Sequence, residues 1–182
     1  AAISAGENGV FTELKDGDAS MNLRRVYYLT DAVRKSARGD SGIQRLHVVG
    51  AGVMGGDIAA VGAMAGLDVT LTDMNEAAID GAIARAAKLF ERRLKTDDKI
   101  AAAKNRLRAD KDGSGASDAD LIIEAVAEKL AVKQAVFQAL EAASKPDAIL
   151  ATNTSAIPLE EIATALKAPE RLIGLHFFNP VP

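Results

Sequence analysis

The feature that most constrains this chain is a short apolar stretch that runs into three closely spaced glycines. Residues 46–50 (LHVVG) form a candidate buried strand, and Gly50, Gly52 and Gly55 follow at its end. Between a strand and a helix, the pattern Gly-X-Gly-X-X-Gly is the fingerprint of a dinucleotide-binding turn. The first glycine permits the turn, the second lets the backbone approach a pyrophosphate, and the third packs the helix against the sheet. The helix predicted over 53–65 would hold the phosphates at its N-terminus.

An acidic residue stands directly after the next predicted strand, 68–72. Asp73 follows Gly50 by 23 residues (73 − 50), close to the spacing of about 20 that is typical of the acid that binds the adenine ribose. Its carboxylate would repel a 2′-phosphate, and no arginine follows it, which favours NAD over NADP. The alternative is that the glycines serve only helix–strand packing, and the acid and the flanking elements argue against it.

Composition excludes several other classes of protein. A chain of 182 residues with 48% hydrophobic residues is long enough for one α/β domain and an appendage. It contains no cysteine, which excludes disulfides and thiolate ligands, and we expect no metal. A net charge of −3 and 4% aromatic residues argue against a nucleic-acid partner. No apolar run is long enough to cross a membrane and the N-terminus does not resemble a signal peptide, so we expect a cytoplasmic protein.

Strand and helix patterns alternate along the rest of the chain. Further strands are predicted over 105–110, 121–126, 148–152 and 171–177, and further helices over 76–95, 97–104, 129–144 and 159–166. The helices 76–95 and 97–104 would form a helical hairpin. This alternation predicts an α/β fold, a Rossmann-type doubly wound and mostly parallel sheet with helices on both faces and a helical-hairpin insertion.

The beginning of the chain lies outside this alternation. Residues 1–19 are polar, and we interpret them as a flexible linker. Residues 20–39 have apolar positions near helical spacing with basic residues between them, which predicts an amphipathic linker helix. Such a helix either packs its apolar stripe on its own domain or connects parts of a larger chain. The predicted nucleotide-binding domain is then residues 40–182.

Polar residues follow the carboxyl ends of two predicted strands, where ligands bind in open parallel sheets. Glu128 and Lys133 come after one of these strands, and Asn153 and Ser155 come after the next. Each has a structural alternative. Glu128 can favour a helix N-terminus, Lys133 can be a solvated surface charge, and the other two can form a turn and a helix cap.

The two histidines differ in their placement. His47 lies inside the first predicted strand, and we interpret it as structural. His176 lies near the end of the last predicted strand, on the side where the cofactor would bind. A side chain with an ordinary pKa near 6.5 suits proton transfer there, although position alone leaves a chemical and a structural role equally open.

Four segments together resemble the L-3-hydroxyacyl-CoA dehydrogenases of fatty-acid β-oxidation. They are 49–59 (VGAGVMGGDIA), 120–126 (DLIIEAV), 153–155 (NTS) and 174–182 (GLHFFNPVP). The resemblance covers roughly residues 44–182, which correspond to the NAD-binding domain of that family. Residues 21–29 (MNLRRVYYL) are similar to the helix that joins the hydratase and dehydrogenase parts of the bacterial multifunctional β-oxidation protein.

The resemblance implies roles for individual residues. His176 would be the catalytic base, taking the proton of the 3-hydroxyl while the C3 hydride passes to the nicotinamide, with Ser155 and Asn179 beside it. The implied NAD contacts come from the glycine turn and the strand ends: Gly50, Gly52, Val53, Met54, Gly55, Asp73, Val126, Ala127, Glu128, Lys133, Asn153, Ser155 and Asn179.

The resemblance also implies partners. Acyl-CoA would be the substrate, and the partners would be hydratase and C-terminal dehydrogenase domains of a parent chain, a thiolase and a second copy in a homo-oligomer. In the family, a glutamate that orients the histidine follows the Asn-Pro-Val-Pro segment. The sequence ends at Pro182, so we expect NAD binding with negligible turnover from these residues alone. The alternatives are a nucleotide-binding or structural module without turnover, and a different Rossmann dehydrogenase that acts on short hydroxy acids.

Two further features of the sequence bear on binding. Asp57 stands where many relatives have a small residue, and the helix N-terminus tolerates a carboxylate there. Lys88, Arg92, Arg93 and Lys95 lie on the predicted hairpin. They form either a basic face for the phosphates of CoA or an ordinary solvated face.

Overall fold

The computed structural model describes residues 15–36, 41–178 and 181, and the chain divides into two compact units, Ala1–Gly42 and Ile43–Pro182. The two units are described separately below. In the described ranges, no helix combines the length and the apolar character that a bilayer span requires. The domain boundary predicted at residue 40 lies outside the described residues.

In the first unit, the described residues include the long helix α2 (Asp18–Ser36), which begins two residues before the predicted start. Residues 37–39 of the predicted helix lie outside the described residues. Residues 15–36, the part of this helical region that the structure describes, contain no buried apolar side chain, and several apolar side chains of α2 are exposed: Met21, Leu23, Val26, Tyr27, Tyr28 and Leu29. An ion pair between Asp31 and Lys35 at 2.7 Å, one helical turn apart, supports the helix.

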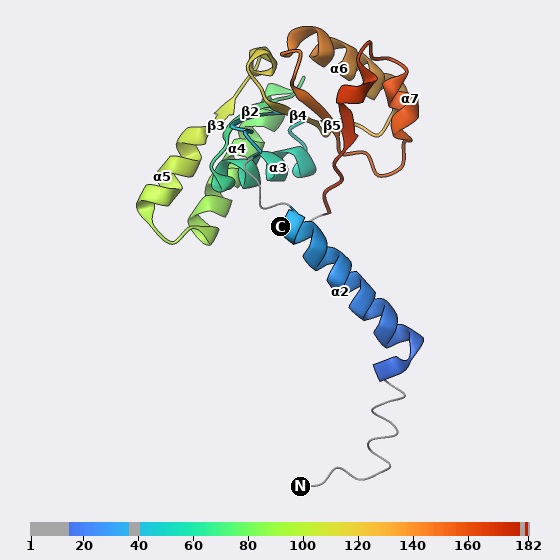
Figure 1. Ribbon diagram of the computed structural model, residues 1–182. Helices are drawn as coiled ribbons and strands as arrows, with labels where there is room; N and C mark the ends of the chain where they lie inside the picture. The colour runs from blue at the N-terminus through green and yellow to red at the C-terminus, as the bar shows by residue number, and fades with distance from the viewer. Residues whose placement is uncertain (1–14, 37–40, 179–180, 182) are drawn as a thin grey trace, which may run out of the picture. The chain divides into compact units, whose positions relative to one another are not determined.

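The second unit is built on one six-stranded sheet with the strand order β3-β2-β1-β4-β5-β6 (Figure 1). The strands are β1 (Arg45–Val49), β2 (Asp68–Thr72), β3 (Leu107–Ala109), β4 (Leu121–Glu124), β5 (Ile149–Thr152) and β6 (Leu172–Gly174). All five strand pairs are parallel. The strand order reverses between β1 and β4, as it does in doubly wound nucleotide-binding sheets.

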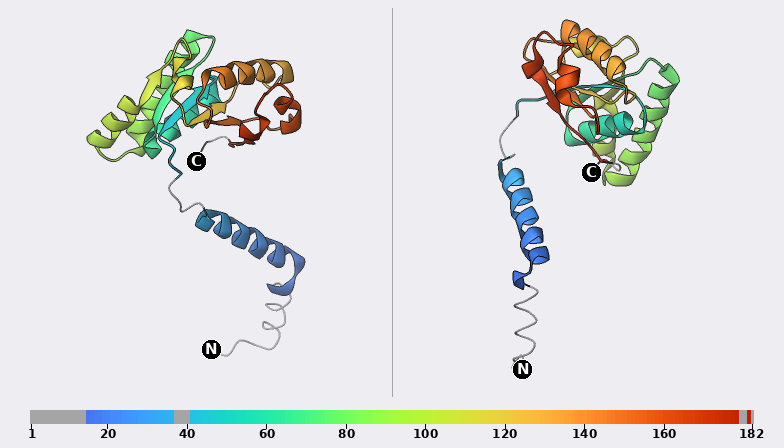
Figure 2. Two further views of the ribbon diagram at one scale, coloured as in Figure 1. Left: turned by 45° about the horizontal axis from the view of Figure 1, so that its top comes forward. Right: turned by 90° about the vertical axis from the view of Figure 1, so that its right-hand side faces the viewer.

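Helices cover both faces of the sheet. They are α3 (Val53–Ala65), α4 (Glu76–Arg93), α5 (Asp97–Arg106), α6 (Leu130–Ala143) and α7 (Leu159–Ala163). The first three pack on one face and the last two on the other, and α4 and α5 form the predicted hairpin (Figure 2). The parallel sheet with helices on both faces confirms the predicted α/β, Rossmann-type fold class.

The two layers follow from the alternation of side chains along each strand. In β1, Leu46 and Val48 pack into the cluster beneath α3 and α4. On the opposite face, Ile122 and Leu150 pack against Phe137 of α6. Because both faces are covered, the central strands are apolar nearly throughout, which is why a polar residue inside one of them is informative.

The last strand is shorter than predicted. The apolar pattern indicates a strand over 171–177, whereas β6 ends at Gly174. Past that point Leu175 donates its N–H to the backbone of Thr152, but the N–H of Phe177 bonds to the side chain of Asn153. A side chain thus replaces the strand partner, and His176 lies beyond the end of the sheet.

Candidate functional site

The glycine turn joins β1 to α3. Gly50 has φ +105°, and a Cβ there would lie 2.6 Å from the carbonyl oxygen of Ala125. A Cβ on Gly55 would lie 1.8 Å from the carbonyl oxygen of Gly50. In contrast, a Cβ built on Gly52, the N-cap of α3, would have no heavy atom of the described residues within 4 Å apart from its chain neighbours. The fold therefore requires the first and third glycines, while the second leaves open space at a helix N-terminus where a phosphate can approach.

Asp73 ties the end of β2 to this turn. Its Oδ2 accepts the N–H of Ala51 at 2.7 Å, and its Oδ1 accepts the N–H of Asn75 at 2.9 Å. The N–H of Gly50 also donates to the backbone of Thr72 at 2.8 Å. The carboxylate therefore lies directly beside the glycine turn, and its oxygens can still accept a hydrogen bond from a ribose hydroxyl.

Arg85 of α4 approaches the same turn from the other side. Its Nη2 lies 3.3 Å from the carbonyl oxygen of Gly52 and 3.5 Å from that of Ala51. The peptide groups of Ala51 are thus contacted by a carboxylate at the N–H and by a guanidinium at the carbonyl. Sequence reasoning missed this residue, because only the packing of α4 on α3 brings it to the turn.

Lys133 is buried, which contradicts the alternative of a solvated surface charge. Its side chain is 1% exposed, and its Nζ lies 2.7 Å from Oε1 of Glu124 and 3.1 Å from Oε2 of Glu128. Glu124 was not among the predicted site residues. The signal for it was present in the sequence, because an acidic residue inside an apolar strand needs a buried partner.

Glu128 holds the loop that follows β5. It accepts the hydroxyl of Thr154 and the N–H groups of Ser155 at 3.2 Å and Ala156 at 3.4 Å. Burial raises the pKa of Glu128, but the hydrogen bonds from Thr154 and Lys133 outweigh it, so the net pKa lies below the ordinary glutamate value. The carboxylate is therefore ionised at neutral pH.

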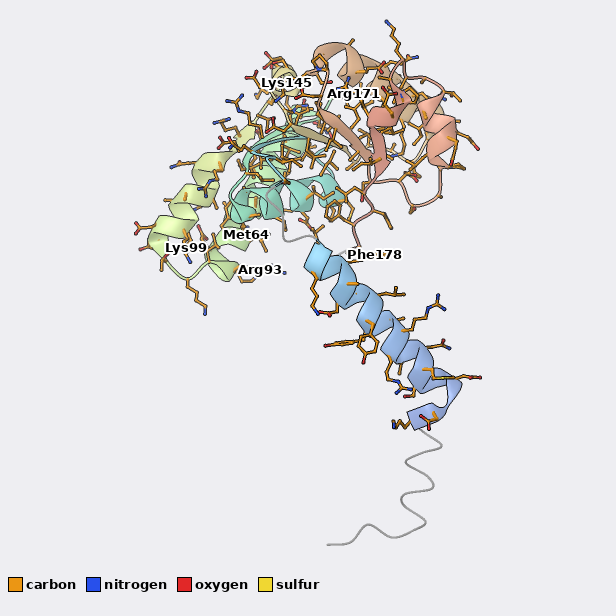
Figure 3. All side chains as sticks on the ribbon, in the orientation of Figure 1. Met64, Arg93, Lys99, Lys145, Arg171 and Phe178 are labelled. Atoms are coloured by element: carbon orange, nitrogen blue, oxygen red, sulfur yellow. The ribbon has the colours of Figure 1, made fainter. Side chains whose placement is uncertain are left out.

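His176 is held by the residue that directly follows β5. Its Nδ1 lies 3.3 Å from the backbone carbonyl of Asn153, whose side-chain Oδ1 accepts the N–H of Phe177 at 2.8 Å. Because a carbonyl only accepts, this contact requires the proton on Nδ1 and leaves Nε2 as the basic nitrogen. The ring packs edge-on against Phe178 with centroids 4.8 Å apart, and Phe178 projects from the surface (Figure 3).

The strand register brings the predicted residues to one edge of the sheet. Val49 pairs with both Thr72 and Glu124, and Glu124 pairs with Thr152. The glycine turn, the Val126–Ala127 segment, Glu128, Asn153, Ser155 and His176 follow directly after these carboxyl ends. Their contacts divide them into two groups. Asp73 contacts the glycine turn, whereas Glu128 and His176 contact the loop after β5. Asn179 lies outside the described residues.

A groove of about 320 Å³ lies between α3 and α4. Its lining is basic, with Asp57 as its acidic member: Asp57, Val61, Arg85, Lys88, Leu89, Arg92, Arg93 and Val181. Arg93 projects at the end of α4 (Figure 3). Of the four basic residues singled out in the sequence, the structure places three in this lining, and Lys95 is not one of them.

His47 lies away from this edge, as its interpretation as a structural residue predicts. It is fully buried (0% exposed), and its Nδ1 lies 2.8 Å from the hydroxyl of Thr70 and 3.6 Å from Asp110. Burial lowers its pKa, and the carboxylate of Asp110 only partly opposes this. The histidine is therefore neutral in the folded protein at neutral pH.

Comparisons with known proteins agree with this geometry. The family described as 3-hydroxyacyl-CoA dehydrogenase, NAD binding domain, matches residues 45–182. The chain is 45% identical over 145 residues to a 3-hydroxybutyryl-CoA dehydrogenase of Mycobacterium tuberculosis, and the match covers 77% of this chain and 51% of that protein. The chain thus spans about half the length of the curated relatives it matches.

Solved structures give the same result. A 3-hydroxybutyryl-CoA dehydrogenase from Escherichia coli superposes with a TM-score of 0.74 at 39% identity, over 77% of this chain and 30% of that chain. The dehydrogenase part of multifunctional enzyme 1 from C. elegans superposes with a TM-score of 0.68 at 32% identity, over 80% and 35%. The expected cofactor, NAD, is confirmed by the family match. The chain belongs to the 3-hydroxyacyl-CoA dehydrogenase family and contains its NAD-binding domain.

Proposed function

We propose that this protein oxidises L-3-hydroxyacyl-CoA to 3-oxoacyl-CoA with NAD in fatty-acid β-oxidation. The observation that carries the proposal is the contact between Nδ1 of His176 and the carbonyl of Asn153 at 3.3 Å. It directs the protonated nitrogen toward the protein and leaves Nε2 for the substrate. A ring nitrogen that carries no proton can accept the proton of a hydroxyl group.

Some residues of the chain would bind the cofactor, and others would act on the substrate. Bound NAD supplies the hydride acceptor. The open turn at Gly52 admits the pyrophosphate, and Asp73 accepts the ribose hydroxyls. Nε2 of His176 takes the proton of the 3-hydroxyl, and in the reverse direction it returns that proton to the developing alkoxide. Ser155 and Asn179 orient the reacting groups.

The basic groove between α3 and α4 supports an acyl-CoA substrate. Arg85, Lys88, Arg92 and Arg93 line it, and the phosphates of CoA are the anionic part of such a substrate. Arginine forks bind phosphate in a bidentate manner, which suits this groove. The relatives named above as 3-hydroxybutyryl-CoA dehydrogenases support a short 3-hydroxyacyl chain.

The proposal includes a larger assembly. One solved relative is the dehydrogenase part of a multifunctional enzyme, which supports a parent chain with more than one activity. The proposed further parts of that chain are a hydratase domain and a C-terminal dehydrogenase domain. A thiolase and a second copy of the chain are the further proposed partners. In such an assembly the product of hydration, a 3-hydroxyacyl-CoA, is the substrate of this domain.

The test is the formation of NADH from 3-hydroxybutyryl-CoA by the complete protein and by its His176→Gln variant. Loss of a general base should lower kcat by about 10²–10⁴-fold while the affinity for NAD stays within about twofold. A complete protein that binds NAD without any turnover would instead favour a nucleotide-binding or structural module. A His176→Gln variant with unchanged kcat would remove His176 from the reaction.

A further inference from the structure

Glu124 is a buried carboxylate that the proposed reaction does not use. It is the last residue of β4 and is 0% exposed. The strand register places it between Val49 of β1 and Thr152 of β5. Because the strand order reverses between β1 and β4, Glu124 lies at the edge of the crevice where nucleotides bind in such sheets.

Both oxygens of Glu124 are hydrogen-bonded to groups from neighbouring elements. Oε1 accepts the N–H of Val126 and Nζ of Lys133, each at 2.7 Å. Oε2 accepts the hydroxyl of Thr152 at 2.8 Å. The carboxylate therefore connects the ends of two strands with α6, and its charge is matched by that of Lys133.

Lys133 extends this connection to the surface. Its Nζ also lies 3.1 Å from Oε2 of Glu128, whose side chain is 42% exposed. Oε1 of Glu128 in turn accepts the N–H groups of Ser155 and Ala156. A continuous series of charged contacts thus runs from the buried end of β4 to the backbone of the loop after β5.

We propose that Glu124 is a positioning residue that acts through Lys133 and Glu128 to fix the backbone of Ser155 and Ala156 beside the nicotinamide. This deepens the proposed function and rests on it for the role of Ser155. Desolvation offsets most of the attraction between two buried charges, so an apolar pair would hold β4 and α6 together equally well. Only the ion pair gives Glu128 a fixed cation to bind.

The test compares three variants of the chain by the free energy of unfolding, the exchange rates of individual amides and calorimetric titration with NAD. Glu124→Gln keeps the size of the side chain and removes its charge. Leu140→Ala, on α6 and away from the carboxylates, is the control for lost stability. The double variant Glu124→Gln/Lys133→Met removes both buried charges, and it should be more stable than Glu124→Gln, which leaves Lys133 without its buried partner.

We expect Glu124→Gln to speed the exchange of the Ser155 and Ala156 amides and to weaken NAD binding on the order of tenfold, the size typical of coupled residues. Leu140→Ala should leave NAD affinity within about twofold of the original chain. The double variant should regain stability while the amides of Ser155 and Ala156 still exchange fast. Its NAD affinity should fall under either explanation, because Lys133 is itself an expected NAD contact. If amide exchange follows stability across all three variants and NAD affinity follows it in the two single variants, Glu124 is merely structural and the proposal is wrong. Because the readout is NAD binding, a failure to find turnover would count against the proposed function and not against this inference.

Discussion

Two glycine-to-alanine substitutions in the glycine turn should separate NAD binding from the stability of the fold. Gly52→Ala adds a Cβ that meets no heavy atom of the described residues within 4 Å except in its chain neighbours, at φ −59°, outside the left-handed region that favours glycine. The free energy of unfolding should change by less than about 1 kcal/mol, because a weaker N-cap is offset by a less flexible unfolded chain. The same methyl occupies the approach of the pyrophosphate, so NAD affinity should fall at least about tenfold.

Gly50→Ala is the matched comparison. Its Cβ would meet the backbone of Ala125 at 2.6 and 2.8 Å, and φ is +105°. A left-handed conformation costs about 1–2 kcal/mol and overpacking about 1–3 kcal/mol, so the free energy of unfolding should fall by about 2–5 kcal/mol. Chemical denaturation and calorimetric titration with NAD measure the two effects. Wild-type NAD affinity in Gly52→Ala would refute the reasoning, because the pyrophosphate would then not pass over that residue.

Two pH-dependent predictions follow from shifted pKa values. Hydrogen bonds from Lys145 and from the N–H groups of Gln44 and Arg45 lower the pKa of Asp120 to about 2. Lys145 itself lies beside Arg171, which donates to its backbone carbonyl (Figure 3). A carboxyl group with a lowered pKa stabilises the fold at pH values above its unfolded pKa near 3.9. Asp120→Asn should therefore lower the free energy of unfolding by about 1–2 kcal/mol at pH 7, after allowance for solvent screening. In urea titrations this difference should disappear between about pH 4 and pH 2. The pKa of His47 is lowered in the folded state, so the unfolded chain binds a proton first as the pH falls below about 6.5. The stability of the fold should therefore decline from pH 7 to pH 5. A His47→Gln variant that shows the same decline in thermal melts would contradict this.

The local features of the site could be predicted from the sequence. The glycine spacing, the helix over 53–65 and the position of Asp73 depend on residues that are near one another in the chain, so the pattern contains the information. The alternation of strands and helices likewise determines a parallel sheet with two covered faces. The last strand was predicted too long, because its apolar pattern continues to Phe177, so His176 was expected inside the strand and lies two residues beyond its end.

The features that sequence reasoning missed depend on packing between distant elements. Lys133 was expected near the cofactor, but its burial against Glu124 was not, because only the approach of α6 to the end of β4 brings the two side chains together. Arg85 reaches the glycine turn because α4 packs on α3. In both cases the partner is a charge or a carbonyl whose position is set by the tertiary fold, and no local spacing records it.

The central claim is that the edge formed by the glycine turn and Asp73 binds NAD. Calorimetric titration of this chain with NAD and with NADP tests it most directly, because it needs no substrate and no other domain. We predict one saturable site for NAD, at least tenfold weaker binding of NADP, and a smaller difference between the two in Asp73→Asn, since the carboxylate that repels a 2′-phosphate is gone. The absence of saturable NAD binding, or equal affinity for the two cofactors in the original chain, would contradict the account.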